Sequence, residues 1–181
     1  MKKEEQNLSN LSSSSYLTFK LGDEVFGVHV SQILNILEMT KITKVPKAPK
    51  YMRGVINLRG MVLPVIDTRI RVGLPEAEDQ KNTCIIVMEL SVDGIDFNVG
   101  TIVDEVLSVI EIYENQTEPP PSLGNNYKSD FITGMAKTDE NFTMIIDMNR
   151  LFSAGEISEL QSNKEQNEST EEKKKETTEA K

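Results

Sequence analysis

Pairs of turn-forming residues divide this sequence into short apolar runs, and that spacing limits the chain to a narrow set of folds. Gly22-Asp23, Arg59-Gly60 and Asp93-Gly94 each stand between two runs rich in β-branched and other apolar residues. Two-residue connections of this kind join antiparallel strands, because glycine and aspartate accept the positive φ angles of a tight hairpin turn. The pattern therefore predicts an all-β fold built from hairpins.

About nine or ten strands are expected, which is too many for one small five-stranded barrel and enough for two. The expected extended segments are 16–21, 24–30, 39–45, 54–58, 61–67, 83–92, 95–103, 106–112, 131–137 and 142–148. One segment departs from the strand pattern. Ser31 can cap a short helix over residues 33–37, whose apolar side chains fall at spacings of three and four. A long loop is expected around residues 119–126, and a turn at residues 139–141.

Both ends of the chain differ in composition from the body. Residues 1–15 include a serine run, and residues 156–181 hold eight glutamates and five lysines with almost no apolar side chain. Such segments cannot bury enough surface to offset their ordering entropy, so both are expected to be disordered tails. A single domain over residues 16–155, made of two β-barrel subdomains, remains. A terminal helix over 155–160 would extend it. The charged tail beyond is interpreted as a solubilising or merely tolerated extension, with a regulatory or spacing role as the alternative.

Charge is distributed unevenly along the 181 residues. The stretch from Lys41 to Arg71 has a net charge of +7, whereas the whole chain has −9, so the remainder has −16. A basic face on an acidic protein is typical of binding to an acidic protein partner, and the acidic remainder argues against nucleic acid. The single cysteine, the lack of a membrane-length apolar run and the polar N-terminal residues make the cytoplasm the expected compartment.

No residue pattern points to catalysis, a metal or a cofactor. His29 is the only histidine and lies between two valines without a nucleophile nearby, and Cys84 lies in an apolar run that keeps a thiol inert. Asp67, Asp104 and Asp147 each end or interrupt an apolar run, but their spacing matches no ligand motif. We therefore expect a protein that is not an enzyme, and a carboxylate- or metal-dependent enzyme that uses these aspartates is the alternative.

The segment Arg53–Arg69, which reads RGVINLRGMVLPVIDTR, resembles the signature of the CheW-like family of bacterial chemotaxis coupling proteins. Further segments occur in the family's order: 16–22 with 26–28, 99–106, 131–134 and 144–147. The resemblance implies two intertwined five-stranded SH3-like β-barrels with a groove between them. It also implies a non-enzymatic adaptor in two-component signal transduction, without a cofactor.

The implied partners are the regulatory domain of the histidine kinase CheA and the cytoplasmic tip of methyl-accepting chemoreceptors. Self-association in array rings is a further implication, and contact with the membrane is expected only indirectly, through receptors. A cytoplasmic protein recruited to membrane-associated arrays follows from these partners. Two alternatives are a CheV-like protein or kinase fragment, which the length disfavours because no receiver domain follows, and a diverged CheW-like module with another signalling partner.

The resemblance also implies positions for receptor or kinase binding. They are Ile33, Asn35, Glu38, Gly54, Arg59, Cys84, Gly100 and Val106. Arg59 matches the arginine of the family's Asn-Leu-Arg-Gly motif, and Asn35 stands where the family commonly has a glutamate, with Glu38 as the alternative carboxylate. We therefore expect Arg59 to be free to meet an acidic group on a receptor or kinase. Core packing is the competing interpretation for Ile33, Cys84 and Val106.

Overall fold

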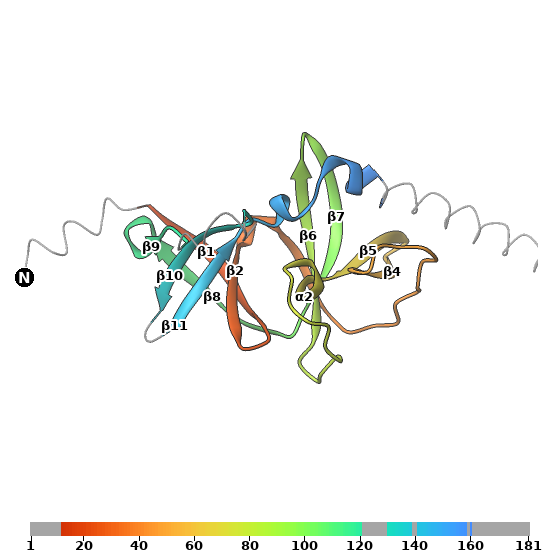
Figure 1. Ribbon diagram of the computed structural model, residues 1–181, viewed down its shortest axis with the longest axis horizontal. Coiled ribbons are helices and arrows are strands. Elements are labelled where there is room, and N and C mark those ends of the chain that lie inside the picture. Colours follow the sequence, from red (N-terminus) through yellow and green to blue (C-terminus); the bar gives the residue numbers. More distant parts are fainter. Residues whose placement is uncertain (1–11, 121–129, 139–140, 159, 161–181) are drawn as a thin grey trace, which may run out of the picture.

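Strands dominate the chain and form two curled sheets, as the all-β prediction required (Figure 1). The computed structural model describes residues 12–120, 130–138, 141–158 and 160. The strands there are β1 Ser13–Leu21, β2 Glu24–His29, β3 Ile33–Glu38, β4 Met52–Leu58, β5 Met61–Asp67, β6 Cys84–Val92, β7 Ile95–Val103, β8 Glu105–Tyr113, β9 Thr117–Glu118, β10 Ile132–Thr138 and β11 Asn141–Ile146. Short helices are η1 Val30–Gln32, α2 Thr68–Arg71, η2 Glu114–Gln116 and η3 Met148–Leu151.

The strands of the second sheet all lie, in the sequence, between two strands of the first sheet. The first sheet has the order β8-β1-β2-β11-β10-β9, and the second has the order β3-β6-β7-β5-β4. Apart from the two-residue β9, each sheet has five strands, which agrees with the predicted pair of SH3-like barrels. The pairs β2 with β11 and β5 with β7 are parallel, and the others are antiparallel. The two sheets lie side by side along the long axis of the molecule (Figure 1).

The predicted two-residue turns form as the sequence requires. In β4–β5 the turn residues Arg59 and Gly60 have φ angles of 54° and 87°, and in β6–β7 Asp93 and Gly94 have 52° and 79°. Two consecutive positive φ angles are what a type I′ hairpin turn needs, because its backbone twist matches that of the flanking strands. Both hairpin predictions are confirmed, and Arg59 stands at the tip of its hairpin.

The helix predicted over residues 33–37 is wrong, because these residues form strand β3. A single 3-10 turn precedes it, and His29, rather than Ser31, caps that turn by accepting a hydrogen bond from the Ser31 amide. Strand β3 pairs antiparallel with β6, and its side chains alternate, with Leu34 and Ile36 exposed between half-buried neighbours. A short isolated helix is marginal in water, so the ladder with β6 prevails over the helical spacing.

The predicted N-terminal tail is too long, and at the other end the helix expected over residues 155–160 extends the domain beyond residue 155. Strand β1 begins at Ser13, opposite Tyr113 of β8, so part of the expected N-terminal tail belongs to the first sheet. Residues 154–158 and 160 are helical, with Ile157 and Leu160 only 0% and 4% exposed. Burying these two apolar side chains supplies the stabilisation that composition alone seemed to lack. Residues 1–11, 121–129, 139–140 and 161–181, which include the rest of both tails, lie outside the described residues.

The largest hydrophobic core is shared by the two sheets. It includes Phe19 and Phe26 of the first sheet, whose rings stack 6.1 Å apart, and Ile66 and Met88 of the second. The helical C-terminal residue Ile157 also belongs to this cluster. Each such side chain contributes about 1.5–3 kcal/mol by burial, so the contact between the sheets is a major part of the stability.

Two arginines of α2 form ion pairs with the segments that connect the two sheets. Arg69 pairs with Asp104 at the β7–β8 junction, and Asp104 also accepts a 2.6 Å hydrogen bond from the Gly22 amide in the β1–β2 turn. Arg71 pairs with Glu156 at 2.9 Å. The helix α2 therefore contacts both the β7–β8 junction, where the chain passes from the second sheet to the first, and the C-terminal segment, where it comes back to the second sheet.

Candidate interaction site

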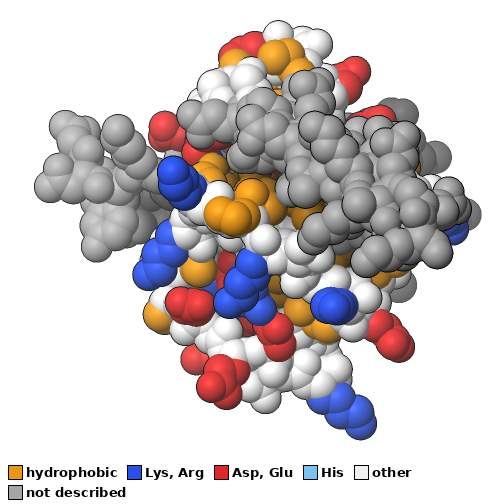
Figure 2. All heavy atoms as spheres, turned by 90° about the vertical axis from the view of Figure 1, so that its right-hand side faces the viewer, with side chains coloured by type: hydrophobic (Ala, Val, Ile, Leu, Met, Phe, Trp, Pro, Cys, Tyr) orange, Lys and Arg blue, Asp and Glu red, His pale blue; other side chains and the backbone are white. Residues whose placement is uncertain are grey.

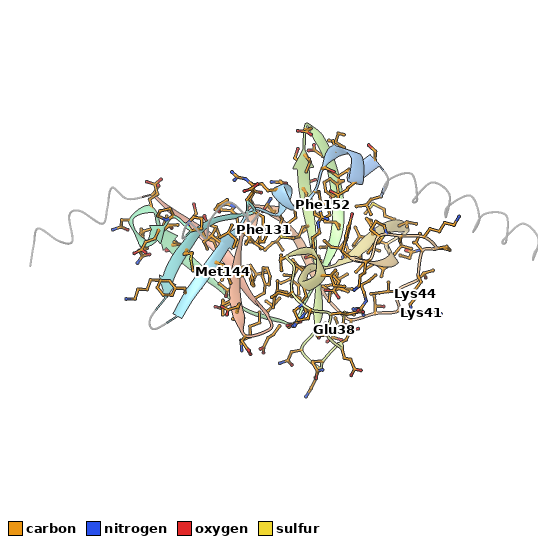
Figure 3. The ribbon with its side chains drawn as sticks, viewed as in Figure 1. Glu38, Lys41, Lys44, Phe131, Met144 and Phe152 are labelled. Carbon is orange, nitrogen blue, oxygen red and sulfur yellow. The ribbon has the colours of Figure 1, made fainter. Side chains whose placement is uncertain are left out.

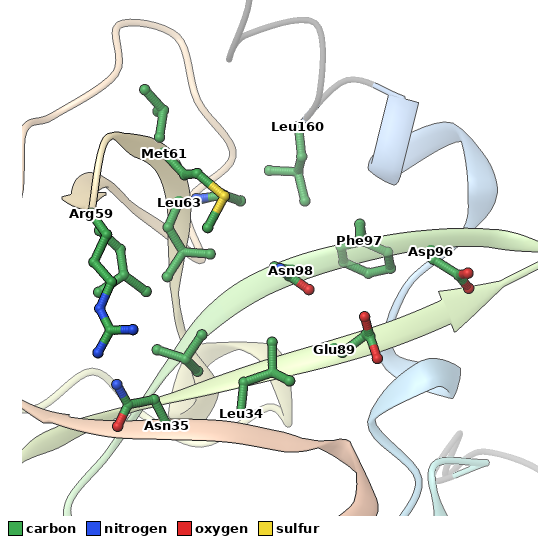
Figure 4. A pocket seen from close by; sticks show the side chains of 14 residues that line it. Leu34, Asn35, Arg59, Met61, Leu63, Glu89, Asp96, Phe97, Asn98 and Leu160 are labelled. Carbon is green, nitrogen blue, oxygen red and sulfur yellow. The ribbon is translucent and has the colours of Figure 1, made fainter.

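A cavity of about 460 Å³ opens on the second sheet (Figure 4). Its walls come from β3, the β4–β5 hairpin, strands β6 and β7, and the C-terminal helical segment. Most of the lining is apolar, including Leu34, Met61, Leu63, Phe97 and Leu160. A pocket that is mainly apolar with a few polar groups at its rim is typical of a binding site.

Charged and polar side chains stand at opposite ends of this cavity. Arg59 and Asn35 face one another across one end, and Asp96 and Glu89 lie towards the other end (Figure 4). The turn that carries Arg59 is fixed by a 2.9 Å hydrogen bond from the Gly60 amide to the Asn57 side chain. The cavity therefore offers a cation at one end and carboxylates at the other.

Arg59 makes no ion pair within the described ranges of the chain. The side chain opposite it, Asn35, uses its Oδ1 to accept a 2.9 Å hydrogen bond from the amide of Ile36. The counting that placed Asn35 opposite Arg59 is thus consistent with the geometry. The arginine retains its capacity to bind an external carboxylate, because the neutral amide does not neutralise it.

Glu38 does not replace the missing carboxylate. It lies opposite Cys84 in the β3–β6 ladder, three residues beyond Asn35, so its side chain projects from the other face of the strand. It is exposed and does not line the cavity with Arg59. Figure 3 places Glu38 at the end of β3, where the chain continues towards Lys41. The alternative pairing is therefore wrong for this fold.

Two predicted glycines shape the second sheet from within. A Cβ at Gly54, where φ is 144°, would lie 2.1 Å from the carbonyl oxygen of Thr43, which bridges to Val55. A Cβ at Gly100 would lie 2.9 Å from a methyl group of Ile85. Both glycines are buried, and the close contacts show that each allows neighbouring segments of the second sheet to approach.

The remaining predicted positions lie near the seam between the sheets. Cys84 stands opposite Glu38 in the ladder, and its thiol hydrogen-bonds to the backbone of Val106. Burial raises the pKa of the Cys84 thiol, and the Val106 hydrogen bond offsets this only in part, so the sulfur stays protonated at neutral pH. Ile33 lies at the other end of β3, opposite Met88. Ile33, Cys84 and Val106 are half-buried against the shared core, which agrees with the packing interpretation.

Sequence reasoning missed a set of exposed apolar side chains. Leu34 and Ile36 project from the edge strand β3, and Leu107 and Val109 project from the edge strand β8, with Val109 58% exposed. Edge strands offer unpaired backbone groups, and apolar side chains on them favour association with another chain. The alternation of Leu34 and Ile36 would have revealed the first pair if residues 33–37 had been interpreted as a strand.

Comparisons with known proteins identify the family. The family model described as "CheW-like domain" matches residues 15–156. The chain belongs to the CheW-like domain family. Among curated proteins, it is 36% identical to the chemotaxis protein CheW of Bacillus subtilis (strain 168) over 133 residues, which cover 74% of this chain and 83% of that protein. It is 31% identical to the probable chemotaxis protein CheW of Rhizobium etli, over 81% of this chain and 92% of that one.

A solved structure agrees with this CheW-like assignment. The crystal structure of scaffolding protein TtCheW from Thermoanaerobacter tengcongensis superimposes with a TM-score of 0.68 and 35% sequence identity. The match covers 78% of this chain and 93% of that protein. The chain is a chemotaxis adaptor with the CheW-like fold, as the resemblance of its sequence implied.

The three aspartates considered for catalysis have separate structural partners in this CheW-like fold. Asp67 caps α2 and pairs with Arg53 at 3.1 Å, and the charges of Asp79 and Asp67 raise the pKa of Arg53 against the effect of burial. Asp104 joins the two sheets, and Asp147 caps η3. Within the described residues, no group of three or more histidine, cysteine, aspartate or glutamate side chains could hold a metal ion.

The described residues contain no helix that is both long enough and apolar enough to cross a membrane.

Proposed function

We propose that this chain couples methyl-accepting chemoreceptors to the histidine kinase CheA and has no catalytic activity of its own. The observation that supports this most directly is Arg59, a cation without a carboxylate partner in the described structure, at the rim of an apolar cavity. A partner with an acidic side chain beside an apolar surface fits this arrangement. The match to the CheW-like domain over residues 15–156 and the similarity to chemotaxis proteins CheW support an adaptor role for this surface.

Two separate surfaces would allow two partners to bind together. The cavity belongs to the second sheet, whereas the exposed edge with Leu107 and Val109 belongs to β8 of the first sheet. Signalling interfaces are often modest in area, and a few residues carry most of their binding energy. One such centre on each sheet is what an adaptor between a receptor and a kinase requires.

Recruitment to the membrane would follow from these contacts. Binding to the cytoplasmic tip of receptors would place the chain in membrane-associated arrays without any membrane contact of its own. Contacts between copies of this chain, or with the regulatory domain of CheA, would extend the array into rings. The edge strands β3 and β8 provide unpaired backbone for such association.

Co-elution tests the proposal directly. The purified chain is mixed with CheA and with a soluble receptor-tip fragment from the same organism, first separately and then together. We expect binding to each, and a rise in kinase activity only in the ternary mixture. A folded chain that binds neither would contradict coupling and would leave the diverged CheW-like module as the answer.

Variants of the two surfaces test whether the Arg59 cavity and the β8 edge bind different partners. Arg59→Gln should weaken binding to one partner about ten-fold, as loss of a central charged contact does. Lys81→Gln is the matched control, because Lys81 is also exposed and makes no ion pair in the described part of the second sheet's loops. Val109→Ser should weaken the other partner and leave the Arg59-dependent one unchanged. Wild-type affinity of Arg59→Gln for both partners would contradict the role of the arginine.

A further inference from the structure

Four exposed lysines follow one another along the segment that connects β3 to β4. They are Lys41, Lys44, Lys47 and Lys50, three residues apart, with half-buried Ile42, Val45 and Ala48 between them. None of the four forms an ion pair within the described part of the chain. We call these four side chains the lysine row. Figure 2, which shows this side of the molecule, has Lys and Arg side chains standing apart over its face.

The lysine row is held against the second sheet next to the Arg59 hairpin. Thr43 exchanges two backbone hydrogen bonds with Val55 of β4, of 2.9 and 2.8 Å. Ile42 packs on the same buried cluster of the second sheet as Leu58, which immediately precedes the hairpin tip. Lys41 and Lys44 lie on the connecting segment below β4 and β5 (Figure 3). The row is therefore a fixed basic surface and not a free loop.

The acidic side chains nearest to this row are already engaged in part. Lys44 borders a shallow hollow with Arg53, Glu76, Glu78 and Asp79. Arg53 pairs with Asp79 at 2.8 Å and with Asp67 at 3.1 Å. Carboxylates therefore lie beside Lys44 without an ion pair to it, and no described carboxylate pairs with any lysine of the row.

The chain leaves the described structure close to the same hairpin. Leu160 is 4% exposed and lines the cavity near Met61, which follows the Arg59-Gly60 turn (Figure 4). Five residues later the sequence enters the segment 165–172, which contains four glutamates and no lysine or arginine. Five extended residues reach about 17 Å, and eight more extend well beyond that. The length suffices to bring this acidic segment to the hairpin and to the row beside it.

We propose that the acidic segment 165–172 of this chain binds the lysine row of the same molecule. The tether keeps the segment at an effective concentration in the millimolar range, so several weak ion pairs are enough to populate the contact. Exposed ion pairs are weak individually and are screened by salt, so the contact forms and opens readily. It covers part of the basic surface and competes with acidic partners for it. This inference does not depend on which partner the chain couples.

Nuclear magnetic resonance of the full-length, ¹⁵N-labelled chain tests the contact without any partner. The variant has Gln at the four glutamates: Glu165→Gln, Glu168→Gln, Glu171→Gln and Glu172→Gln. At low salt we expect its backbone amide signals to differ from wild type over residues 41–50 and near Arg59. In the matched control Lys173, Lys174 and Lys175 are all changed to Gln, which leaves the four glutamates in place, so its signals over residues 41–50 should not move towards those of the glutamine variant. Addition of 0.5 M salt, which shortens the Debye length to about 4 Å, should make wild type resemble the glutamine variant.

Identical shifts over residues 41–50 in wild type and the glutamine variant would overturn the proposal, as would changes confined to another surface. A dilution series distinguishes a contact within one molecule from a contact between two copies of the chain. Shifts that do not change with protein concentration support binding within one molecule, whereas shifts that vanish on dilution would show contact between copies and overturn it. Because no partner is present, the outcome is independent of the co-elution result.

Discussion

The two sheets of this protein have nearly equal numbers of strands but are assembled from the sequence in different ways. The second sheet uses the consecutive strands β3 to β7, whereas the first combines β1 and β2 with β8 to β11. The second encloses a buried cluster of six residues of its own, whereas the separate cluster of the first has only Ile112, Ala136 and Ile145. The first sheet therefore depends more heavily on the core that the two sheets share.

The second sheet pairs strands that are close in the sequence, whereas the first also pairs strands from opposite ends of the chain, and this affects the stability of each. Hairpins joined by two-residue connections close at small entropic cost, and each sheet contains two of them: β1–β2 and β10–β11 in the first, β4–β5 and β6–β7 in the second. The first sheet must bring strands from opposite ends of the chain together before β2 can pair with β11. We expect the second sheet to be the more resistant of the two to local opening.

Phe19→Ala is the strongest test of the shared core. Phe19 is 2% exposed in β1 and belongs to the cluster that both sheets supply. Its truncation should lower the free energy of unfolding by about 3–5 kcal/mol, measured by urea denaturation, and Phe19→Leu should cost much less. Hydrogen exchange then shows whether both sheets lose protection together. If β6 and β7 keep full protection while β1 opens, the sheets are independent units and the shared core is less important than we infer.

Gly54→Ala should distort the edge of the second sheet alone. The added methyl group meets the Thr43 carbonyl, whereas at Gly60, whose φ is also positive, nothing lies within 4 Å. Thermal denaturation should therefore show Gly54→Ala to be less stable than Gly60→Ala by about 1–3 kcal/mol. Equal stability of the two variants would mean that the Thr43–Val55 bridge yields freely.

Glu156→Gln tests how much the Glu156 carboxylate contributes to the stability of the C-terminal segment. Although burial opposes it, hydrogen bonds from Arg71 and Ser153 lower the pKa of Glu156 from 4.5 to about 2. A carboxylate with a lowered pKa stabilises the folded state above pH 4.5 and loses this effect as the pH falls towards 2. Because Glu156 is partly exposed, we expect a loss of about 1 kcal/mol at neutral pH.

Melting temperatures of wild type and Glu156→Gln between pH 2 and 7 check this pH dependence. The difference between the two proteins should be largest near neutral pH and should shrink below pH 4.5. A difference that stays constant over the whole range would show that the variant acts through packing of the C-terminal segment and not through the carboxylate charge.

Asn35→Glu is expected to have the smallest effect on stability. It places a carboxylate across the cavity from Arg59, and a partly exposed pair of this kind contributes about 0–1 kcal/mol. Its main consequence is for binding, since the new carboxylate competes with an acidic partner for the arginine. Titration calorimetry with that partner should show weaker binding than for the control Asn35→Gln. Unchanged affinity would indicate that Arg59 does not meet an acidic group.

Local chemistry made much of the fold predictable. The hairpins at Arg59-Gly60 and Asp93-Gly94 follow from turn residues that accept positive φ angles within two positions. The segment 33–37 was mispredicted because its apolar spacing fits a helix as well as an edge strand, and only the distant strand β6 decides between them. Likewise, Leu160 is buried by contacts with the second sheet that composition cannot reveal.

The candidate site was less accessible from the sequence than the fold. Counting along the resembling segments related Asn35 to Arg59, and both line one cavity, whereas Glu38 lies on the opposite face because strand side chains alternate. The cavity itself is built from β3, the β4–β5 hairpin and the C-terminal helical segment. No local pattern shows that such distant segments meet, so its volume and apolar lining emerge only in three dimensions.

The nesting of the second sheet within the first has a consequence for synthesis on the ribosome. Among the described elements, the hairpin β1–β2 emerges first, and the entire second sheet follows before β8 and β11 are made. Until then β2 presents an unpaired edge, since its parallel neighbour joins Val25 to Thr143 near the other end of the fold. Exposed strand edges invite association with other nascent chains. One edge of strand β2 therefore stays unpaired until β11 has been synthesised. When many ribosomes translate one message, this exposed edge is the first site at which neighbouring nascent chains would associate.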